Sequence, residues 1–371
     1  MIKVSRGCLG EEELAAVREA FTYGYFGHAY KVIEFEEEVK KYLGAEHVVA
    51  VNSGTAALHL TLDALGIGGG DEVITPSLTF VGAYQAISAT GAKPVAVDIQ
   101  PDTLLLDIED VEKKISPKTK AIMPVHYAGN PCDMDALLQI GERNQIRIIE
   151  DAAHAFGSYY RGSKIGSFGD IACFSFDSIK NITCGEGGAV VCHQAELADL
   201  LRQKRACGIK REAAASSDWK ERSLSYQVLM QGFRYHMSNI NAAIGLEQLK
   251  KVDSFINRRR EICRRYDRAF KDVTPIRCLP VNYDEVAPHI YVIRVKNGRR
   301  DRIIYYLKER NIETGINYIP NHLHKLYADK AVHLPETEKA YQEILTLPLH
   351  CDLSNDDVDE VIEGVVNGLN M

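Results

Sequence analysis

Residues 146–189 contain an amine, a carboxylate and an imidazole in an order that suits one kind of cofactor chemistry. Asp151 ends the apolar run IRIIED, His154 follows three residues later, and Lys180 stands in a polar turn before the glycine-rich run CGEGGA. A cofactor that acts as an electron sink needs a lysine for its aldehyde and an acid beside its pyridine nitrogen. We therefore predict that Lys180 forms a Schiff base with pyridoxal phosphate and then acts as general base, while Asp151 faces the ring nitrogen.

A helix start and a hydroxyl would hold the phosphate of such a cofactor. The segment NSGTAALHL (52–60) follows the apolar run HVVAV, and the N–H groups at a helix start bind anions. Ser175, near the end of the apolar run DIACFSF, would add a hydroxyl. Each group also has a structural explanation, since Asp and Ser commonly cap helices and a loop lysine is usually solvated. The occurrence of all of them in this order favours a cofactor site.

Short apolar runs alternate with helix-like segments over the first half of the chain. The predicted strands are 47–51, 71–76, 93–99, 120–127, 146–151, 170–176 and 188–192, and the predicted helices are 10–22, 32–44, 55–65 and 133–144. Strands joined by helical crossovers imply an α/β fold with a mostly parallel mixed sheet flanked by helices. Such folds bind ligands beyond the carboxyl ends of their strands, so Asp151 and Ser175 should meet in one crevice.

A long helix pattern from 239 to 270 marks the transition to a smaller C-terminal α/β domain. We place the boundary within it, which gives a large cofactor-binding domain at 1–253 and a small domain at 254–371. The N-terminal helix is a candidate to pack on the small domain. The polar segment 208–227 lacks periodicity and is predicted to be a loop.

The composition argues against several classes of function. Lys and Arg total 44 against 51 Asp and Glu, and the net charge of -7 argues against a nucleic-acid surface. No stretch approaches the roughly 18 apolar residues of a membrane span, and no signal-peptide core is visible, so we expect a cytoplasmic protein. The cysteines form no C-x-x-C pair. We therefore expect no metal site and mostly buried, reduced thiols, with Cys184 as the alternative, reactive candidate.

The motifs together resemble the DegT/DnrJ/EryC1/StrS sugar aminotransferases, a family of fold-type I aminotransferases. The resemblance runs nearly end to end and is most specific in EDAAH, FSF and K-x-x-x-x-GEGG, which occur in that order and spacing. Further matching segments include GYFGHAYKVIEFEEEVKKYLG, NSGTAALHL, GDEVITPSLTFVGAYQAI, PVHYAGNPCDMD and MSNINAAIGLEQLKKVD. The resemblance implies a large domain followed by a smaller one, with pyridoxal 5'-phosphate as the cofactor.

Carried onto this sequence, the resemblance assigns seven residues to the cofactor. Lys180 is then the Schiff-base lysine, Asp151 the partner of the pyridinium, and His154 a neighbour of the ring. Phe80 would stack on the ring face, a contact worth roughly 0.5–1.5 kcal/mol, although a plain core role is the alternative. The phosphate would be held by three residues from two segments: Gly54, Thr55 and Ser175.

One segment departs from the family pattern. Many relatives carry an Asn in a GYN-Y-R-M segment that reaches the phosphate bound by the neighbouring subunit. This sequence has GFRYHM, with Arg234 in place of that Asn and His236 where Arg is common. Arg234 suits a phosphate because its planar guanidinium donates paired hydrogen bonds to oxyanions, and Asn239 is a second candidate. The resemblance thus implies a homodimer with its active site at the subunit interface.

The resemblance implies amination of a keto sugar carried on a nucleotide diphosphate, with glutamate or glutamine as the donor. Relatives that remove oxygen from the sugar carry His in place of the lysine, so Lys180 favours amination. His154 favours a 4-keto-6-deoxy sugar, because many members that aminate C3 carry Gln there. A C3 keto sugar, a keto-cyclitol and a non-catalytic regulatory protein that binds pyridoxal phosphate remain alternatives. His322, His324 and Lys325 are either diphosphate contacts or ordinary surface residues.

Overall fold

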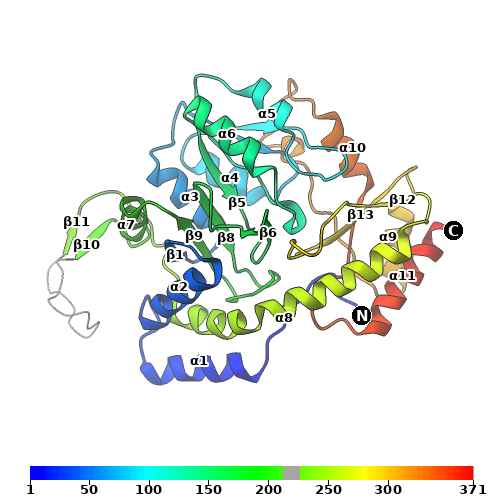
Figure 1. Ribbon diagram of the computed structural model, residues 1–371, viewed down its shortest axis with the longest axis horizontal. Coiled ribbons are helices and arrows are strands. Elements are labelled where there is room, and N and C mark those ends of the chain that lie inside the picture. The colour runs from blue at the N-terminus through cyan, green and yellow to red at the C-terminus, as the bar shows by residue number, and fades with distance from the viewer. Residues whose placement is uncertain (212–225, 371) are drawn as a thin grey trace.

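Within the residues that the computed structural model describes, 1–211 and 226–370, a seven-stranded sheet forms the centre of the larger part (Figure 1). Strand β9 runs antiparallel to both of its neighbours, β1 and β8, and the other pairs are parallel. The predicted α/β fold with a mostly parallel mixed sheet is confirmed. In sheet order the strands are β1 (His47–Val51), β9 (Gly188–Cys192), β8 (Ile171–Ser175), β5 (Arg147–Asp151), β4 (Thr119–Ile122), β2 (Glu72–Pro76) and β3 (Lys93–Val97).

Helices cover both faces of this sheet. Successive residues of a strand point to opposite sides, and here both sides carry apolar side chains that must be buried. Val48 and Ala50 of β1 belong to the hydrophobic cluster on the α2 side, whereas Val49 and Val51 belong to the cluster on the α3 side. The helical segments of this part are α2 (Tyr30–Leu43), α3 (Gly54–Ala64), α4 (Val81–Ala89), α5 (Ile108–Lys114), η1 (Tyr127–Gly129), α6 (Met134–Asn144) and α7 (Ala195–Lys204).

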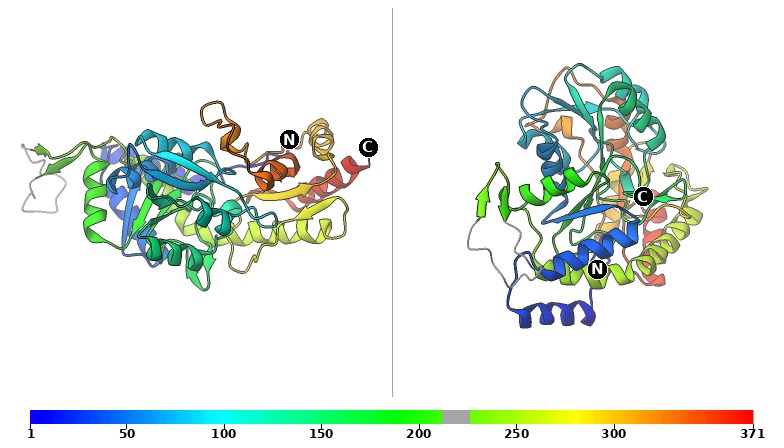
Figure 2. Two further views of the ribbon diagram at one scale, coloured as in Figure 1. Left: turned by 90° about the horizontal axis from the view of Figure 1, so that it is seen from above. Right: turned by 60° about the vertical axis from the view of Figure 1, so that its left-hand side comes forward.

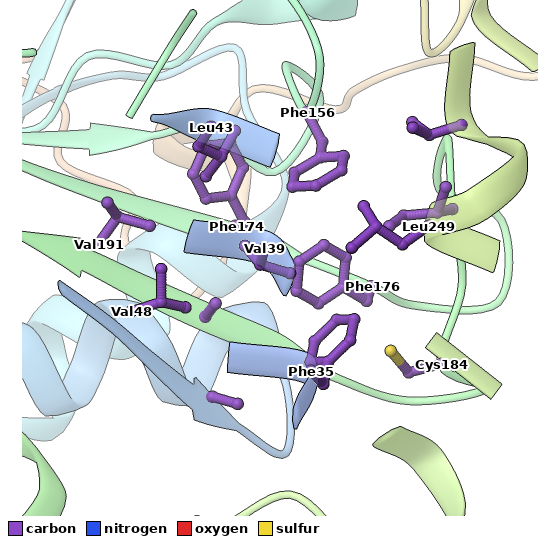
Figure 3. Close-up of a cluster of buried hydrophobic side chains, with 14 of the residues drawn as sticks. Phe35, Val39, Leu43, Val48, Phe156, Phe174, Phe176, Cys184, Val191 and Leu249 are labelled. Carbon is purple, nitrogen blue, oxygen red and sulfur yellow. The ribbon is translucent and has the colours of Figure 1, made fainter. Parts of the chain in front are cut away.

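Aromatic rings fill the cluster between α2, the sheet and α8 (Figure 3). Phe176, directly after β8, packs edge-on against both Phe35 and Phe156, with ring centroids 5.3 Å apart in each pair. Cys184 lies in the same cluster and is fully buried, and this burial raises the pKa of its thiol. Cys184 is therefore a core residue rather than a reactive thiol.

Helix α8 (Asn239–Phe270) joins the large sheet to the C-terminal part (Figures 1 and 2), and its bounds are those predicted from the sequence. Leu246 and Leu249 belong to the hydrophobic cluster between α2, the sheet and α8, where Figure 3 shows Leu249, whereas Tyr266 and Phe270 belong to the C-terminal core. The division into 1–253 and 254–371 remains our proposal. The elements after α8 are β12 (Ile276–Cys278), β13 (Tyr291–Val295), α9 (Arg300–Glu309), η2 (Asn321–Leu323), α10 (Pro335–Glu343), β14 (Ile344–Leu347) and α11 (Asn355–Leu369).

The N-terminal helix α1 (Glu11–Tyr23) lies along the first half of α8 (Figure 1). Glu13 is buried in this contact, and its Oε1 accepts a hydrogen bond of 2.8 Å from Nε2 of Gln248. The segment before α1 reaches the C-terminal part instead, where Ile2 forms a parallel bridge with Ile312. The first residues of the chain thus pack against its last third.

Two small antiparallel pairs complete the described structure: β6 (Tyr159–Tyr160) with β7 (Ser163–Lys164), and β10 (Ile209–Arg211) with β11 (Tyr226–Val228). The segment predicted to be a loop at 208–227 therefore begins and ends in paired strands, and 212–225 lie outside the described residues. No helix of the described chain has the length and apolar character needed to cross a membrane. The described residues also contain no group of three or more His, Cys, Asp or Glu placed to hold a metal ion.

Candidate active site

A cavity of about 330 Å³ lies beyond the carboxyl ends of β5 and β8, beside the first turns of α3 and α4. This is the place where α/β sheets bind ligands. Seven of the nine residues predicted from the sequence line it: Gly54, Thr55, Phe80, Asp151, His154, Ser175 and Lys180. The fold therefore brings together residues from several separate stretches of the chain.

The side chain of Lys180 is partly buried and lines this cavity. Burial lowers the pKa of the amine from 10.5 to about 8, and the nearby carboxylates of Asp151 and Asp177 oppose this fall. A neutral amine attacks a carbonyl and an ammonium does not. Burial thus brings the nucleophilic form of Lys180 close to neutral pH, which is typical of catalytic lysines.

Asp151 is the last residue of β5, and its carboxyl is buried. Burial raises the pKa of this carboxyl, while the N–H of Ala153, which donates to Oδ1 at 3.2 Å, and the charges of Lys180 and His126 oppose the rise. Because the pKa stays raised, this buried carboxylate gains stability when a further cation is placed against it. A protonated aromatic nitrogen would be such a cation.

The ring of His154 is buried and has an unused nitrogen. Its Nε2 lies 2.9 Å from the hydroxyl of Tyr318, and its Nδ1 has no hydrogen-bond partner in the described structure. Burial lowers the pKa of the ring well below its usual value, so the ring is neutral. A buried polar atom without a partner costs free energy. Nδ1 therefore marks a position at which a polar group of a bound molecule would be stabilised.

The first turn of α3 forms the wall of the cavity that suits an anion. Ser53 caps this helix, because its hydroxyl accepts a hydrogen bond of 3.0 Å from the N–H of Ala56. Gly54 allows β8 to come close: a Cβ at this position would lie 2.8 Å from Cβ of Ser175. The positive end of the helix dipole and the Ser175 hydroxyl consequently face the same space.

Phe80 stands directly before α4 and is 57% exposed, which excludes the alternative of a plain core role. Its ring centroid is 5.9 Å from that of Tyr318. Asn321 holds the loop that carries Phe80, since its Nδ2 donates to the carbonyl oxygens of Ser77 (3.2 Å) and Thr79 (2.9 Å). An aromatic ring that is exposed at the cavity and held on a fixed loop suits stacking on a flat ligand.

His322, like Asn321, holds the loop that carries Phe80, and it does not line the cavity. Its Nδ1 lies 2.7 Å from the hydroxyl of Ser77, and the side chain is buried. His324 is half-buried and Lys325 is exposed. None of these three histidine and lysine side chains lines the cavity that contains Lys180.

Arg234 and Asn239 lie away from the cavity of their own chain. Arg234 lines a second cavity of about 470 Å³ together with Arg205 and His236. Asn239 is fully buried at the start of α8, where its Oδ1 accepts a hydrogen bond of 2.9 Å from the N–H of Lys31. Neither residue approaches Lys180 within one chain.

Two residues of the C-terminal part complete the site without having been predicted. His289, just before β13, places Nε2 at 3.4 Å from Nζ of Lys180. Tyr318 stands in the loop before η2 and lines the cavity. A tyrosine in a loop has no specific sequence signal. His289 has no comparable signal either, because it begins the apolar run HIYVIRV, whereas Asp151 ends its own run.

Comparisons with known proteins show which family and which solved structures the chain is similar to. The chain matches the model of the DegT/DnrJ/EryC1/StrS aminotransferase family over residues 7–366. It is similar to the aminotransferase TlmJ from Streptoalloteichus hindustanus, with a TM-score of 0.93 and 37% identity over 100% of this chain and 99% of that one. It is also similar to the putative sugar aminotransferase Spr1654 from Streptococcus pneumoniae in its PMP form, with a TM-score of 0.94 and 32% identity over 100% of this chain and 99% of that one. A third similar structure is PseC of Helicobacter pylori, an aminotransferase involved in the biosynthesis of pseudoaminic acid. Its TM-score is 0.93, with 29% identity over 100% of this chain and 99% of that one.

Proposed function

The chain belongs to the DegT/DnrJ/EryC1/StrS aminotransferase family, and from this premise we propose that it transfers an amino group to a keto sugar carried on a nucleotide diphosphate. Pyridoxal 5'-phosphate is the cofactor, and glutamate or glutamine is the amino donor. One observation carries the proposal: the Lys180 amine and the Asp151 carboxyl share a cavity at the ends of neighbouring parallel strands.

The groups that line the cavity fit this cofactor. The amine of Lys180 can bind the aldehyde, and the buried carboxylate of Asp151 can stabilise a protonated pyridine nitrogen. Nδ1 of His154, which has no partner in the described structure, can form a hydrogen bond with a polar group on the cofactor ring. The helix start at Gly54, held close against Ser175, suits the phosphate.

The bound cofactor would withdraw electrons from the carbon that gains or loses the amino group. Lys180 would hold the aldehyde through Nζ, and its free amine would serve as the base that takes up and returns the proton of the transfer. Asp151 keeps the proton on the ring nitrogen, because a carboxylate next to that nitrogen favours its charged form. His154 orients the ring through Nδ1, and Phe80 covers one face and limits the entry of water.

A 4-keto-6-deoxy sugar is the acceptor that we favour. His154 supports this choice, because many relatives that aminate C3 carry Gln at its place. The lining also includes Val125 and Ile179. These apolar side chains suit a methyl group better than a hydroxymethyl group, which would lose hydrogen bonds to water there. A C3 keto sugar and a keto-cyclitol are the competing acceptors.

A second copy of the chain would complete the site. The described lining of the cavity around Arg234 contains no carboxylate. Burial lowers the pKa of His236, and the charges of Arg234 and Arg205 lower it further. Arg205 is already paired with Glu36, so Arg234 is the guanidinium in this cavity that favours a bound anion. We assign it, in a homodimer, to the phosphate at the partner subunit's site, with Asn239 supporting the same surface from the start of α8.

Absorbance spectroscopy tests the cofactor proposal. Protein mixed with pyridoxal phosphate should show a visible band of the lysine-bound cofactor, and glutamate or glutamine should bleach it. Lys180→Ala should remove the band, whereas Lys164→Ala, which changes a second lysine whose pKa is lowered by burial, should leave it unchanged. A band that persists in Lys180→Ala would show that the aldehyde is bound by a residue other than Lys180. A band that neither donor bleaches would favour the non-catalytic alternative.

Product analysis tests the acceptor. The loaded protein is incubated with glutamate or glutamine and with nucleotide-linked 4-keto-6-deoxy sugars, 3-keto sugars and a keto-cyclitol in turn. NMR of the products should locate the new amino group at C4. Amination of the 3-keto sugar alone, or of the cyclitol alone, would replace the acceptor proposed here while keeping the transamination.

A further inference from the structure

His289 is a buried base beside the Lys180 amine, and the roles described above leave it unused. Its side chain comes from the C-terminal part and is 2% exposed. Its Nε2 faces Nζ of Lys180 at 3.4 Å, which is within hydrogen-bond reach. The ring also packs against that of His154, with centroids 4.4 Å apart. His289 thus contacts both a reacting atom and the residue that would orient the cofactor ring.

The backbone on both sides of this ring is anchored. The N–H of His289 donates to the carbonyl of Ala128 at 3.2 Å. Its own carbonyl accepts a hydrogen bond of 3.1 Å from Nη1 of Arg259, which is itself buried and also donates to Leu349 at 3.1 Å. A ring fixed in this way keeps its position relative to Lys180 without help from a ligand.

The charge state of His289 decides which atom donates. Burial lowers the pKa of this ring well below its usual value, and the charges of Lys180 and Arg259 act in the same direction. The ring is therefore neutral, and Nε2 accepts a hydrogen bond from the Lys180 ammonium. The proton of the ring is then on Nδ1, which is buried without a partner in the described structure. The charged or titratable groups facing this pair are Asp151, His154, Asp177, Glu186, Arg259 and Tyr318.

We propose that Nε2 of His289 is the acceptor that holds the protonated form of the Lys180 amine, and that this contact lets Lys180 both take up and return the proton of the transfer reaction. Burial alone drives a lysine toward its neutral form. A proton carrier must also hold its proton, and a hydrogen bond to the charged form restores that ability. His289 would thus be a catalytic residue that sets the balance between the two forms. This inference rests on the proposed role of Lys180.

The test measures the protonation of Lys180 in protein without cofactor. Pyridoxal phosphate is added over a range of pH, the adduct is trapped with borohydride, and its initial rate of formation at residue 180 is measured by peptide mass mapping. The rate follows the neutral amine, so its midpoint reports the pKa of Lys180 and in the wild-type protein should lie below 10.5. His289→Phe keeps a ring but has no acceptor, and its midpoint should fall by about one pH unit. His289→Gln places an oxygen near the position of Nε2, so its midpoint should stay close to that of the wild type.

A second variant and a control separate the possible results. His289→Asn is polar and also lacks an acceptor at the position of Nε2, so it should behave as His289→Phe does, and it replaces that variant if His289→Phe does not fold. His59→Gln, at a buried histidine on α3, should leave the midpoint unchanged. An unchanged midpoint in His289→Phe or in His289→Asn would overturn the inference and leave His289 a packing residue. Absence of any adduct at residue 180 in the wild-type protein would instead overturn the role of Lys180 itself.

Discussion

The amine of Lys180 is destabilising for the protein that contains it. Its pKa falls from 10.5 to about 8 on burial, a change that corresponds to about 3 kcal/mol against the charged form. This is the net cost that remains after the charges of Asp151 and Asp177 have opposed the effect of burial. Residues that are costly for stability and suited to chemistry are typical of active sites, where stability is exchanged for reactivity.

Lys180→Met should therefore stabilise the protein without cofactor. At pH 7, below both pKa values, the lysine is charged in the folded and the unfolded chain, and the burial cost is fully present. As the pH rises from 8 toward 10.5, the folded protein loses the proton first, so the cost disappears. Thermal unfolding followed by circular dichroism should show a melting temperature higher by a few degrees at pH 7 and a smaller difference at pH 10.

Lys118→Met provides the control for this substitution, because Lys118 is exposed and its removal should not change the melting temperature. A destabilised Lys180→Met at pH 7 would show that the contacts of the amine with Asp151 and His289 outweigh the cost of its burial. The net cost stated above would then be wrong.

The close approach of α3 to β8 positions the phosphate wall of the cavity. A side chain at Gly54 has no room, because its Cβ would lie 2.8 Å from Cβ of Ser175. Gly54→Ala should push the helix start away from the strand end. Overpacking of this kind costs about 1–3 kcal/mol, and if this cost falls on the phosphate wall the Kd for pyridoxal phosphate should rise by about 5- to 150-fold. Fluorescence or absorbance titration measures this constant.

Gly69→Ala is the matched control for this element. A Cβ at Gly69 meets no atom within 4 Å, and its backbone does not require a glycine. The cofactor affinity of Gly69→Ala should equal that of the wild type. Equal affinities for Gly54→Ala and the wild type would mean that the phosphate is held elsewhere.

The sequence predicts strongly patterned elements well and fails where a pattern is missing. Helix α4 (Val81–Ala89) is buried and apolar on most sides, so it has no amphipathic repeat to detect. The strand predicted at 120–127 ends at Ile122, shortly before Pro124, which cannot donate to the sheet. The antiparallel direction of β9 has a physical reason. Parallel neighbours need a long crossover that is usually helical, and the loop that carries Lys180 contains no helix.

The candidate site is less predictable at the scale of the whole molecule. Motifs identified the groups that follow β5 and β8, because each stands next to a recognisable strand. His289 is 109 residues from Lys180 in the chain. Its place in the site depends on how the C-terminal part packs against the sheet, and no local spacing encodes that packing. Tyr318 was missed for the same reason.

Subunit mixing tests the assignment of Arg234 to a shared site. Lys180→Ala and Arg234→Ala should each be nearly inactive alone. When the two are refolded together, half of the dimers contain one chain of each kind, and one site in such a dimer has both residues intact. The mixture should therefore regain about a quarter of the wild-type activity per chain.

Lys180→Ala mixed with Asp151→Ala is the control, because both residues lie in the cavity of one chain and every mixed site lacks one of them. This mixture should stay inactive. Recovery in the control, or none in the mixture with Arg234→Ala, would contradict the assignment to the partner subunit.

Helix α8 has a consequence for how enzymes of this architecture can diversify. One uninterrupted helix of 32 residues supplies Leu246 to the core of the large sheet and Phe270 to the C-terminal core. A recombination event inside α8 would join two half-helices whose apolar stripes were selected against different neighbours. Exchange of the whole C-terminal part as one unit is therefore disfavoured, and new acceptor preferences would arise more readily by point substitution in segments such as 317–326, which contains η2.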